Sequence, residues 1–273
     1  MLHCVAAVFL LGKKGIHAVI GAVPLSPVHY ALLFLAGLAA GFVDAVAGGG
    51  GMITVPALLW AGLPPQIALG TNKLQSSCGT TLAVSNYARA GLIDWKSMRL
   101  VVPVTFLSAS LGAYVVTLVS NDVLKKIVPW LLLGIAVYAL ISPRLGLHRG
   151  SAKLTITAFA LLAGSVLGFY DGFFGPGTGS FWTIALIVLL GMELTRATAY
   201  TKVVNLASNL ASLAIFIVAK CVRYDVALAM IGGQLIGARL GSSMVVKHGA
   251  PFVRVVFLIV VFALTAKLLW DTF

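Results

Sequence analysis

Long apolar runs separated by short polar or glycine-rich stretches form the pattern of this chain. Eight runs approach the 17–25 residues that a helix needs to cross a bilayer, although two of them have only 15. They cover Val28–Ala47, Ala68–Tyr87, Leu100–Val119, Ile127–Ile141, Leu154–Gly168, Thr198–Ala219, Val226–Val246 and Phe252–Leu269. The pattern predicts an all-α polytopic membrane protein with about eight transmembrane helices.

Two shorter apolar runs, Met52–Ala61 and Phe181–Leu190, each follow a glycine-rich break. A helix of ten residues is about 15 Å long, which is half the thickness of the hydrocarbon core. We therefore expect two half-helices in addition to the eight spans.

The chain also resembles itself. GFVDAVAGGG at Gly41–Gly50 matches GFYDGFFGPG at Gly168–Gly177 with an offset of 127. Further matches at an offset of 129 pair Gly62 with Gly191, Ala68 with Ala197, Lys73 with Lys202 and Gly112 with Gly241. Two halves broken at matching places are typical of secondary transporters, and the breaks then mark the substrate site. An old duplication with no site between the halves is the alternative.

These matches divide the chain into an N-terminal extension (1–27), a first membrane repeat (28–142), a cytoplasmic linker (143–153) and a second repeat (154–273). If the short runs turn back, the loop lysines and arginines divide 11 to 5 between the two sides; if they cross, the division is 7 to 9. The positive-inside rule favours the first arrangement, with eight crossings and both termini cytoplasmic. Four spans per half would make the repeats parallel, and five would make them inverted.

Composition supports the membrane interpretation. Of 273 residues, 60% are apolar and 10% charged, whereas a soluble domain carries about 25% charged residues. The net charge of +12 is explained by basic loops, and no nucleic-acid-binding motif accompanies it, so we expect the lipid bilayer as a partner and no nucleic acid. The spacing of Cys4, Cys78 and Cys221 predicts no disulfide and no metal site, and we expect no cofactor.

Two carboxylates, Asp44 and Asp171, lie inside spans at matched positions, four residues before each glycine loop. Such a charge costs roughly 3 kcal/mol at a helix centre, so it should be paired or functional. Three interpretations stay open: the carboxylate orders the loop by accepting its N–H groups, it exchanges a proton during transport, or it pairs with a lysine.

Two lysines each begin a polar stripe on one helical face. Lys73 is followed by Ser76 and Thr80, and Lys202 by Asn205, Asn209 and Ser212. A polar face inside a bundle is expected to line a cavity or contact a partner helix. The alternative is that each lysine snorkels to the nearby helix start.

The loops Gly48–Gly51 and Gly175–Ser180 allow close backbone approach to a ligand, and the N-terminus of each following half-helix is suited to an anion. Lys73, Lys202 and Arg239 outnumber the two aspartates, which favours a small anion. The predicted substrate-binding residues are Lys73, Lys202, Gly49, Gly50, Gly51, Gly177, Thr178, Gly179, Ser76, Asn205 and Asn209. Protons are a further expected partner if the aspartates couple transport.

Gly237 and Gly241 stand at the small-xxx-small spacing, matched by Ser108 and Gly112, which predicts close helix packing. In the same stretch Gln234 and Arg239 are candidates for the transport pathway. Arg239 could instead pair with Asp171 or with a backbone carbonyl.

The sequence resembles the sulfite exporter TauE/SafE family, also called the toluene sulfonate uptake permease family. The resemblance lies in GFVDAVAGGGGMITVPALLWAGLPPQIALGTNKLQ, GFYDGFFGPGTGSFWTIALIVLLGMELTRATAYTKVVN and GQLIGARLGS, and it covers about residues 28–270. It implies an inner-membrane carrier of sulfur-containing anions such as sulfite or sulfonates, without naming the substrate of this branch.

The leading hypothesis is a secondary carrier of a small anion that works by alternating access around a site between the repeats. No Walker A motif is present, so ATP hydrolysis within this chain is not expected. An anion channel is the first alternative. An intramembrane enzyme with Ser180 as nucleophile is the second; the five histidines lie in loops or at span ends, and we expect no enzyme.

Overall fold

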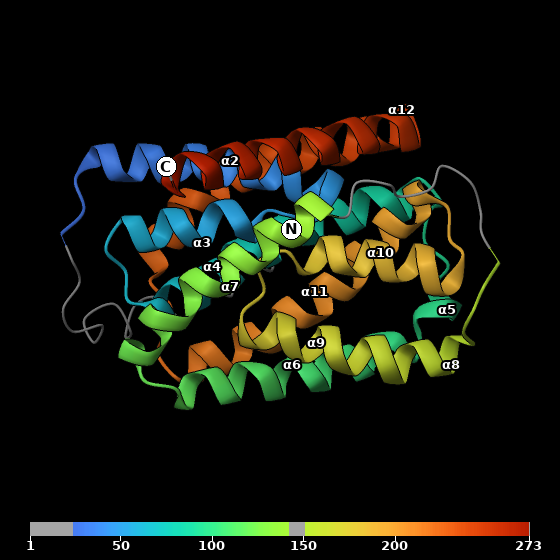
Figure 1. The fold of residues 1–273 in the computed structure, drawn as a ribbon, viewed down its shortest axis with the longest axis horizontal. Helices are drawn as coiled ribbons and strands as arrows, with labels where there is room; N and C mark the ends of the chain where they lie inside the picture. Colours follow the sequence, from blue (N-terminus) through green and yellow to red (C-terminus); the bar gives the residue numbers. More distant parts are fainter. Residues whose placement is uncertain (1–23, 142–150, 273) are drawn as a thin grey trace.

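The computed structural model describes residues 24–141 and 151–272; the side chains of 135–141, 254 and 257–272 lie outside the description. Within these ranges every regular element is a helix (Figure 1). Most of the predicted N-terminal extension and linker lie outside the described residues, as do Lys13, Lys14, Arg144 and Arg149.

The described chain forms eight long helical stretches, two half-helices and one short helix. In order they are α2 (Pro27–Ala47), α3 (Gly51–Trp60), α4 (Pro65–Arg89), α5 (Trp95–Met98), α6 (Val101–Leu118), α7 (Asn121–Ile141), α8 (Ile156–Phe159), the π-helical turn η1 (Ala160–Gly164), α9 (Ser165–Phe173), α10 (Thr178–Leu190), α11 (Leu194–Val218) and α12 (Tyr224–Thr272). The half-helices are α3 and α10, the short helix is α5, and in this count α8, η1 and α9 form one continuous stretch. Helix α12 counts as two stretches, because its backbone leaves the helical region at Gly249 (φ 64°, ψ −154°), ahead of Pro251.

Four helical segments of the described chain are long and apolar enough to cross a membrane: Pro27–Ala47, Trp95–Leu118, Ile156–Phe173 and Leu194–Val218. Helix α4 is as long as α11, with 25 residues, but it is not among these four segments. The polar residues of α4 lower its hydropathy, and they include Lys73 and Ser76 of the predicted site. The number of crossings stays a prediction.

Proline and glycine set most helix ends where the sequence predicts them. Helix α2 begins with Pro27 and ends at Gly48, whose φ of 79° is left-handed. Helix α10 lies between Gly177 and Gly191, which both have positive φ. The two spans of 15 residues were predicted too short. Helix α7 begins six residues before Ile127, and the helix predicted to end at Gly168 continues to Phe173.

The two half-helices return along the helices that precede them. The ring of Trp60, at the end of α3, lies 5.4 Å from the ring of His29, at the start of α2. Leu154 donates its N–H to the Leu189 carbonyl, so α10 ends beside the start of α8. The first hairpin thus enters and leaves at the left end of Figure 1, the second does so at the right end, and their breaks meet in the middle.

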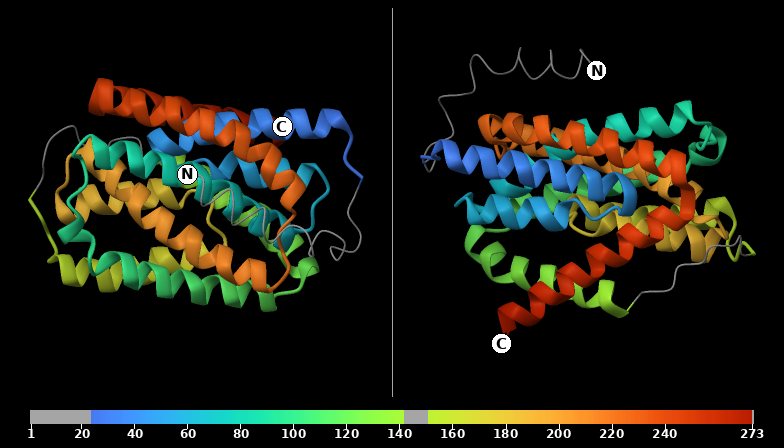
Figure 2. Two further views of the ribbon diagram at one scale, coloured as in Figure 1. Left: turned by 180° about the vertical axis from the view of Figure 1, so that it is seen from behind. Right: turned by 90° about the horizontal axis from the view of Figure 1, so that it is seen from above.

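Helices α4 and α11 cross the centre in opposite directions. At one end the Asp94 N–H lies 3.0 Å from the Tyr200 hydroxyl; at the other, the Arg223 N–H donates to Thr71 Oγ1 over 3.0 Å. Figure 2 shows the same antiparallel bundle from two further sides.

Glycines let the outer helices pack backbone to backbone. A Cβ at Gly41 of α2 would collide with the Gln234 carbonyl of α12, and a Cβ at Gly172 of α9 would collide with the Ala109 carbonyl of α6. The close packing predicted for Gly237 and Gly241 is confirmed, because both lie against the backbone of α2. Thus α2 of the first half packs on α12 of the second half, and α9 of the second half packs on α6 of the first half.

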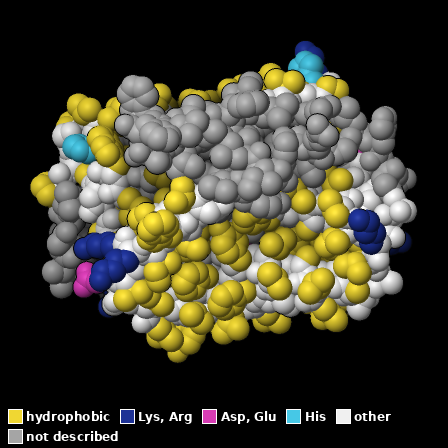
Figure 3. All heavy atoms as spheres, viewed as in Figure 1, with side chains coloured by type: hydrophobic (Ala, Val, Ile, Leu, Met, Phe, Trp, Pro, Cys, Tyr) yellow, Lys and Arg dark blue, Asp and Glu magenta, His cyan; other side chains and the backbone are white. Residues whose placement is uncertain are grey.

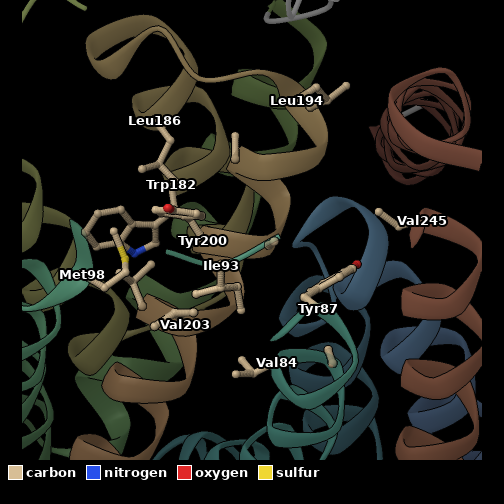
Figure 4. Packing of buried hydrophobic residues seen from close by; sticks show 14 of the residues in the cluster. Val84, Tyr87, Ile93, Met98, Trp182, Leu186, Leu194, Tyr200, Val203 and Val245 are labelled. Carbon is tan, nitrogen blue, oxygen red and sulfur yellow. The ribbon is translucent and has the colours of Figure 1, made fainter. Parts of the chain in front are cut away.

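The surface and the core fit a protein surrounded by lipid. In Figure 3 apolar side chains cover the lower part of the visible face, and most of the visible charged side chains lie toward its left and right ends. Inside, Trp182 of α10 packs with Met98, Tyr200 and Val203, as Figure 4 shows, and its ring lies 6.0 Å from that of Phe159. This cluster fixes one half-helix; the Tyr87 hydroxyl, which donates to the Ala45 carbonyl, holds the end of α2.

Candidate functional site

Two fully buried lysines lie on the two helices that cross the centre of the molecule. The side chain of Lys73, on α4, is 1% exposed, and that of Lys202, on α11, is 0% exposed. Neither lysine snorkels to the surface. Since a buried lysine must be paired, each one needs a carboxylate within reach.

Each lysine pairs with the aspartate of the other half. Lys73 Nζ lies 2.6 Å from Asp171 Oδ1, and Lys202 Nζ lies 3.1 Å from Asp44 Oδ2. Of the three interpretations left open by the sequence, the geometry shows lysine pairing: no hydrogen bond from a loop N–H to either carboxylate is found among the described residues. The pairs cross between the halves, and this the sequence did not indicate.

Each member of the first pair makes a further hydrogen bond. Lys73 also donates to Asn209 Oδ1 over 3.2 Å, and Asp171 also accepts from the Ser208 hydroxyl. The Asp171 side chain is only 5% exposed. Both further partners of this pair come from α11, in the second half.

The second pair is looser. Lys202 and Asp44 lie within ion-pair distance but are not oriented for a hydrogen bond. Lys202 Nζ has no hydrogen-bond partner among the described residues. The Asp44 side chain is 17% exposed, more than three times the value for Asp171. This pair is therefore held by charge attraction alone and lies nearer to solvent.

A small polar cavity of about 30 Å³ lies between the pairs. It has room for no more than about two water molecules. Its lining contains Asp44, Lys73, Asp171, Ser76, Asn205, Asn209, Gly51, Gly177, Thr178 and Gly179, all predicted from the sequence, together with Gly48, Asn72 and Gly175, which were not. Thus residues far apart in the sequence converge on one site.

The two half-helices begin at this cavity. Gly51 opens α3, and Gly179 lies in the first turn of α10. Neither backbone N–H has an acceptor in the part of the chain that the structure describes. Two positive helix ends, arriving from opposite ends of the molecule, thus present unpaired donors to the same space.

The breaks touch each other. A Cβ at Gly48 would collide with the backbone of Gly179, and the Ser180 hydroxyl donates to the Ala47 carbonyl over 3.1 Å. Of the described histidines, His29 and His248, neither hydrogen-bonds to Ser180. Its observed contact ties the two breaks together.

Threonines that the sequence reading missed hold the half-helices against α4 and α11. Thr54 donates to Asn72 over 2.5 Å, and Thr183 lies 3.0 Å from Thr201. Thr54 matches Thr183, and Asn72 matches Thr201, at the offset of 129. Internal matching could therefore have found these residues, although Thr54 and Thr183 lie within apolar runs. Ser208 has no such signal, because Gly79 stands at its matched position.

Five predicted site residues are not part of the cavity lining. One of them is Lys202, whose partner Asp44 lines the cavity. Gly49 and Gly50 belong to the break, where Gly50 packs on the Asp44 side chain. Gln234 is buried against Gly79. Arg239 donates to Asn86 Oδ1 over 2.5 Å rather than to Asp171, and it lines a separate pocket.

Comparisons with known proteins identify the family of this chain. The model of the family described as sulfite exporter TauE/SafE matches residues 33–268. A probable membrane transporter protein of Haemophilus influenzae is 42% identical over 241 residues, which cover 88% of this chain and 94% of the relative. The probable membrane transporter protein YfcA of Escherichia coli is 40% identical over 247 residues, covering 90% of this chain and 92% of the relative.

No solved structure matches the chain. The family match spans most of its length and includes both glycine breaks, both aspartates and both central lysines. The chain is therefore a membrane transporter that belongs to the sulfite exporter TauE/SafE family.

Proposed function

We propose that this protein is a secondary carrier of a small anion, which binds between the two halves and crosses by alternating access. One observation carries the proposal: two half-helix N-termini with unpaired N–H groups converge with Lys73 on one central cavity. Helix ends that point at the membrane centre in this way are suited to an anionic group.

The charge count of the centre does not by itself favour an anion. Two lysines and two aspartates cancel, and Arg239 lies elsewhere. The preference rests on the donors: the helix N–H groups are not neutralised, and an anion can replace a carboxylate beside its lysine. In the absence of an anion, the aspartates keep the lysines paired.

Transport requires the halves to move. A cavity of about 30 Å³ is too small for an anion of several heavy atoms, and the Gly48–Gly179 contact closes the centre. This favours a carrier over a channel. We take the halves to be inverted repeats of five crossings each, since the two hairpins enter from opposite ends.

Ten crossings would place both termini on one side and divide the basic residues 7 to 9, so the charge bias no longer assigns that side. We place the protein in the bacterial inner membrane, as the family resemblance implies. We assign the substrate to sulfur oxyanions or organosulfonates on the same ground, and the more exposed Asp44 is our candidate for exchanging a proton.

Flux into proteoliposomes tests the proposal. Sulfite, thiosulfate, simple sulfonates and carboxylates are compared with and without a pH gradient, and the expected result is saturable flux of at least one sulfur anion. Linear, non-saturating flux would instead indicate a channel. Saturable movement of a cation, with none of the anions moving, would contradict the proposal.

Lysine variants sharpen this test. Lys73→Ala and Lys202→Ala are expected to weaken anion binding at least about tenfold, because each removes a full charge from a site with little water. Lys96→Ala, at an exposed position in α5, is the matched control and should leave flux unchanged. Wild-type affinity in both central variants would show that these lysines serve only the fold.

A further inference from the structure

A second pocket opens between α4 and α12, on the side of α4 away from the central cavity. Its volume is about 610 Å³, within the range of small-molecule sites. Cys78, Leu82 and Arg89 line it from α4; at 100° per residue they face almost opposite to Lys73 and Ser76. The pocket is therefore separate from the proposed transport site.

The lining of this pocket is amphipathic along its length. Apolar side chains, among them Leu82, Ile231 and Ile236, line one part, and the two arginines Arg89 and Arg239 lie toward the end of α4. From Cys78 to Arg89 the helix rises about 16 Å, which is half the hydrocarbon thickness of a bilayer. The pocket thus spans one leaflet, with its charge at the depth of the headgroups.

Among the described side chains, neither arginine has an internal counter-ion. The six carboxylates whose side chains the structure describes are all engaged elsewhere: Asp44 and Asp171 with the central lysines, Asp122 with Lys125, Asp225 with Arg223, and Asp94 and Glu193 as helix caps. At Asp94, hydrogen bonds from the Ser97 hydroxyl and the Lys96 N–H hold the carboxyl pKa below its usual value, so it stays ionised as a cap.

Asn86 orients one of the two arginines. It accepts from Arg239 Nη1 over 2.5 Å and donates to Ser242 over 2.7 Å. The matched positions of the other half, by the offset of 129, are Ser110 and Val218 in place of Arg239 and Arg89. The charge at this groove is thus a property of one half only.

We propose that this pocket binds an anionic phospholipid, with the phosphate between Arg89 and Arg239 and an acyl chain along Leu82, Ile231 and Ile236. Arginine is suited to a phosphate because its planar guanidinium donates two parallel hydrogen bonds. The apolar part of the pocket favours a lipid over free phosphate.

Native mass spectrometry of the full chain in detergent tests the proposal, with dioleoyl phosphatidylglycerol and dioleoyl phosphatidylcholine as probes. We expect the anionic lipid to be retained at least about tenfold more tightly, and Arg89→Gln and Arg239→Gln each to remove most of that preference. Arg99→Gln and Arg196→Gln, at exposed arginines outside the pocket, are the matched controls and should retain it.

The side chain of Arg89 makes no hydrogen bond and no ion pair in the described part of the chain. Arg89→Gln should therefore fold even if Arg239→Gln does not. Equal retention of the two lipids, or unchanged preference in Arg89→Gln, would overturn the proposal. Displacement of the lipid by millimolar inorganic phosphate would reduce the site to a phosphate site. Displacement by a short alkylsulfonate would assign the pocket to an organic anion instead.

Discussion

The Lys73–Asp171 pair and the Lys202–Asp44 pair occupy matched positions in the two halves, yet the first is tightly held and the second is not. The first pair is 2.6 Å long and has two further partners, Asn209 and Ser208. The second is 3.1 Å long, makes no hydrogen bond and is nearer to solvent.

The difference arises from the residues around the pairs. At the positions matched to Asn209 and Ser208, the first half has Thr80 and Gly79. The Thr80 hydroxyl has no partner in the described structure, and Gly79 has no side chain to donate. Equivalent charges are thus held unequally, and under the proposed function we expect an anion or a proton to open the looser pair first.

Neutralising the aspartates should give the largest effects. Asp171→Asn leaves Lys73 buried and unpaired, which costs about 3–5 kcal/mol of folding free energy. Asp44→Asn should cost less, about 1–3 kcal/mol, because water can reach Lys202 from the exposed side of Asp44. Thermal unfolding of the purified variants in detergent measures both.

A double variant separates the pair from other effects. Lys73→Met combined with Asp171→Asn removes both charges and should unfold near the wild-type temperature. Equal losses for the two single aspartate variants would contradict the inequality of the pairs. Failure of the double variant to recover stability would show that Asp171 acts through Ser208 instead.

The contact between the breaks gives the next largest effect. Gly48→Ala places a Cβ against the backbone of Gly179, whereas Gly91→Ala places one in open space. Both glycines have positive φ, so the conformational cost of about 1–2 kcal/mol is shared.

Flux through Gly91→Ala should therefore stay near wild type, while Gly48→Ala should lose at least about tenfold. Proteoliposome flux, normalised to the reconstituted protein, measures this difference. Similar flux in the two variants would mean that the halves do not need this close approach.

The threonines should give the smallest effect. Thr54→Val and Thr183→Val each remove a buried hydroxyl that contacts α4 or α11 and also the preceding turn, and should each cost about 1 kcal/mol of stability. Thr54→Val should also alter anion affinity, because its partner Asn72 lines the cavity, whereas Thr201 does not. A larger change of affinity in Thr183→Val would contradict this order.

The sequence predicted the parts of the site better than their connections. Half-helices after the glycine breaks, matched lysines with polar stripes and membrane aspartates all follow from spacing and composition, whereas the burial of the lysines came from the structure. Internal matching shows which positions correspond, but it does not show which half packs on which. Hence the crossed pairs, Lys73 with Asp171 and Lys202 with Asp44, emerged only from the structure.

The packing of each half-helix on the helix before it was also beyond the sequence. Counting loop charges favoured short runs that turn back, but it did not show that the start of α2 and the end of α3 lie together at His29 and Trp60. A loop charge reports only a bias between two sides, while hairpin geometry depends on packing around Gly48 and Gly177.

Binding to charge-neutralised pairs tests the central claim most directly. Equilibrium binding of the anion that moves fastest in the flux panel is measured for wild type, Lys73→Met/Asp171→Asn and Lys202→Met/Asp44→Asn. We predict that both double variants unfold near the wild-type temperature and bind at least about tenfold more weakly. A folded double variant that binds the anion as tightly as wild type would contradict the account, because the pairs would then only hold the halves together.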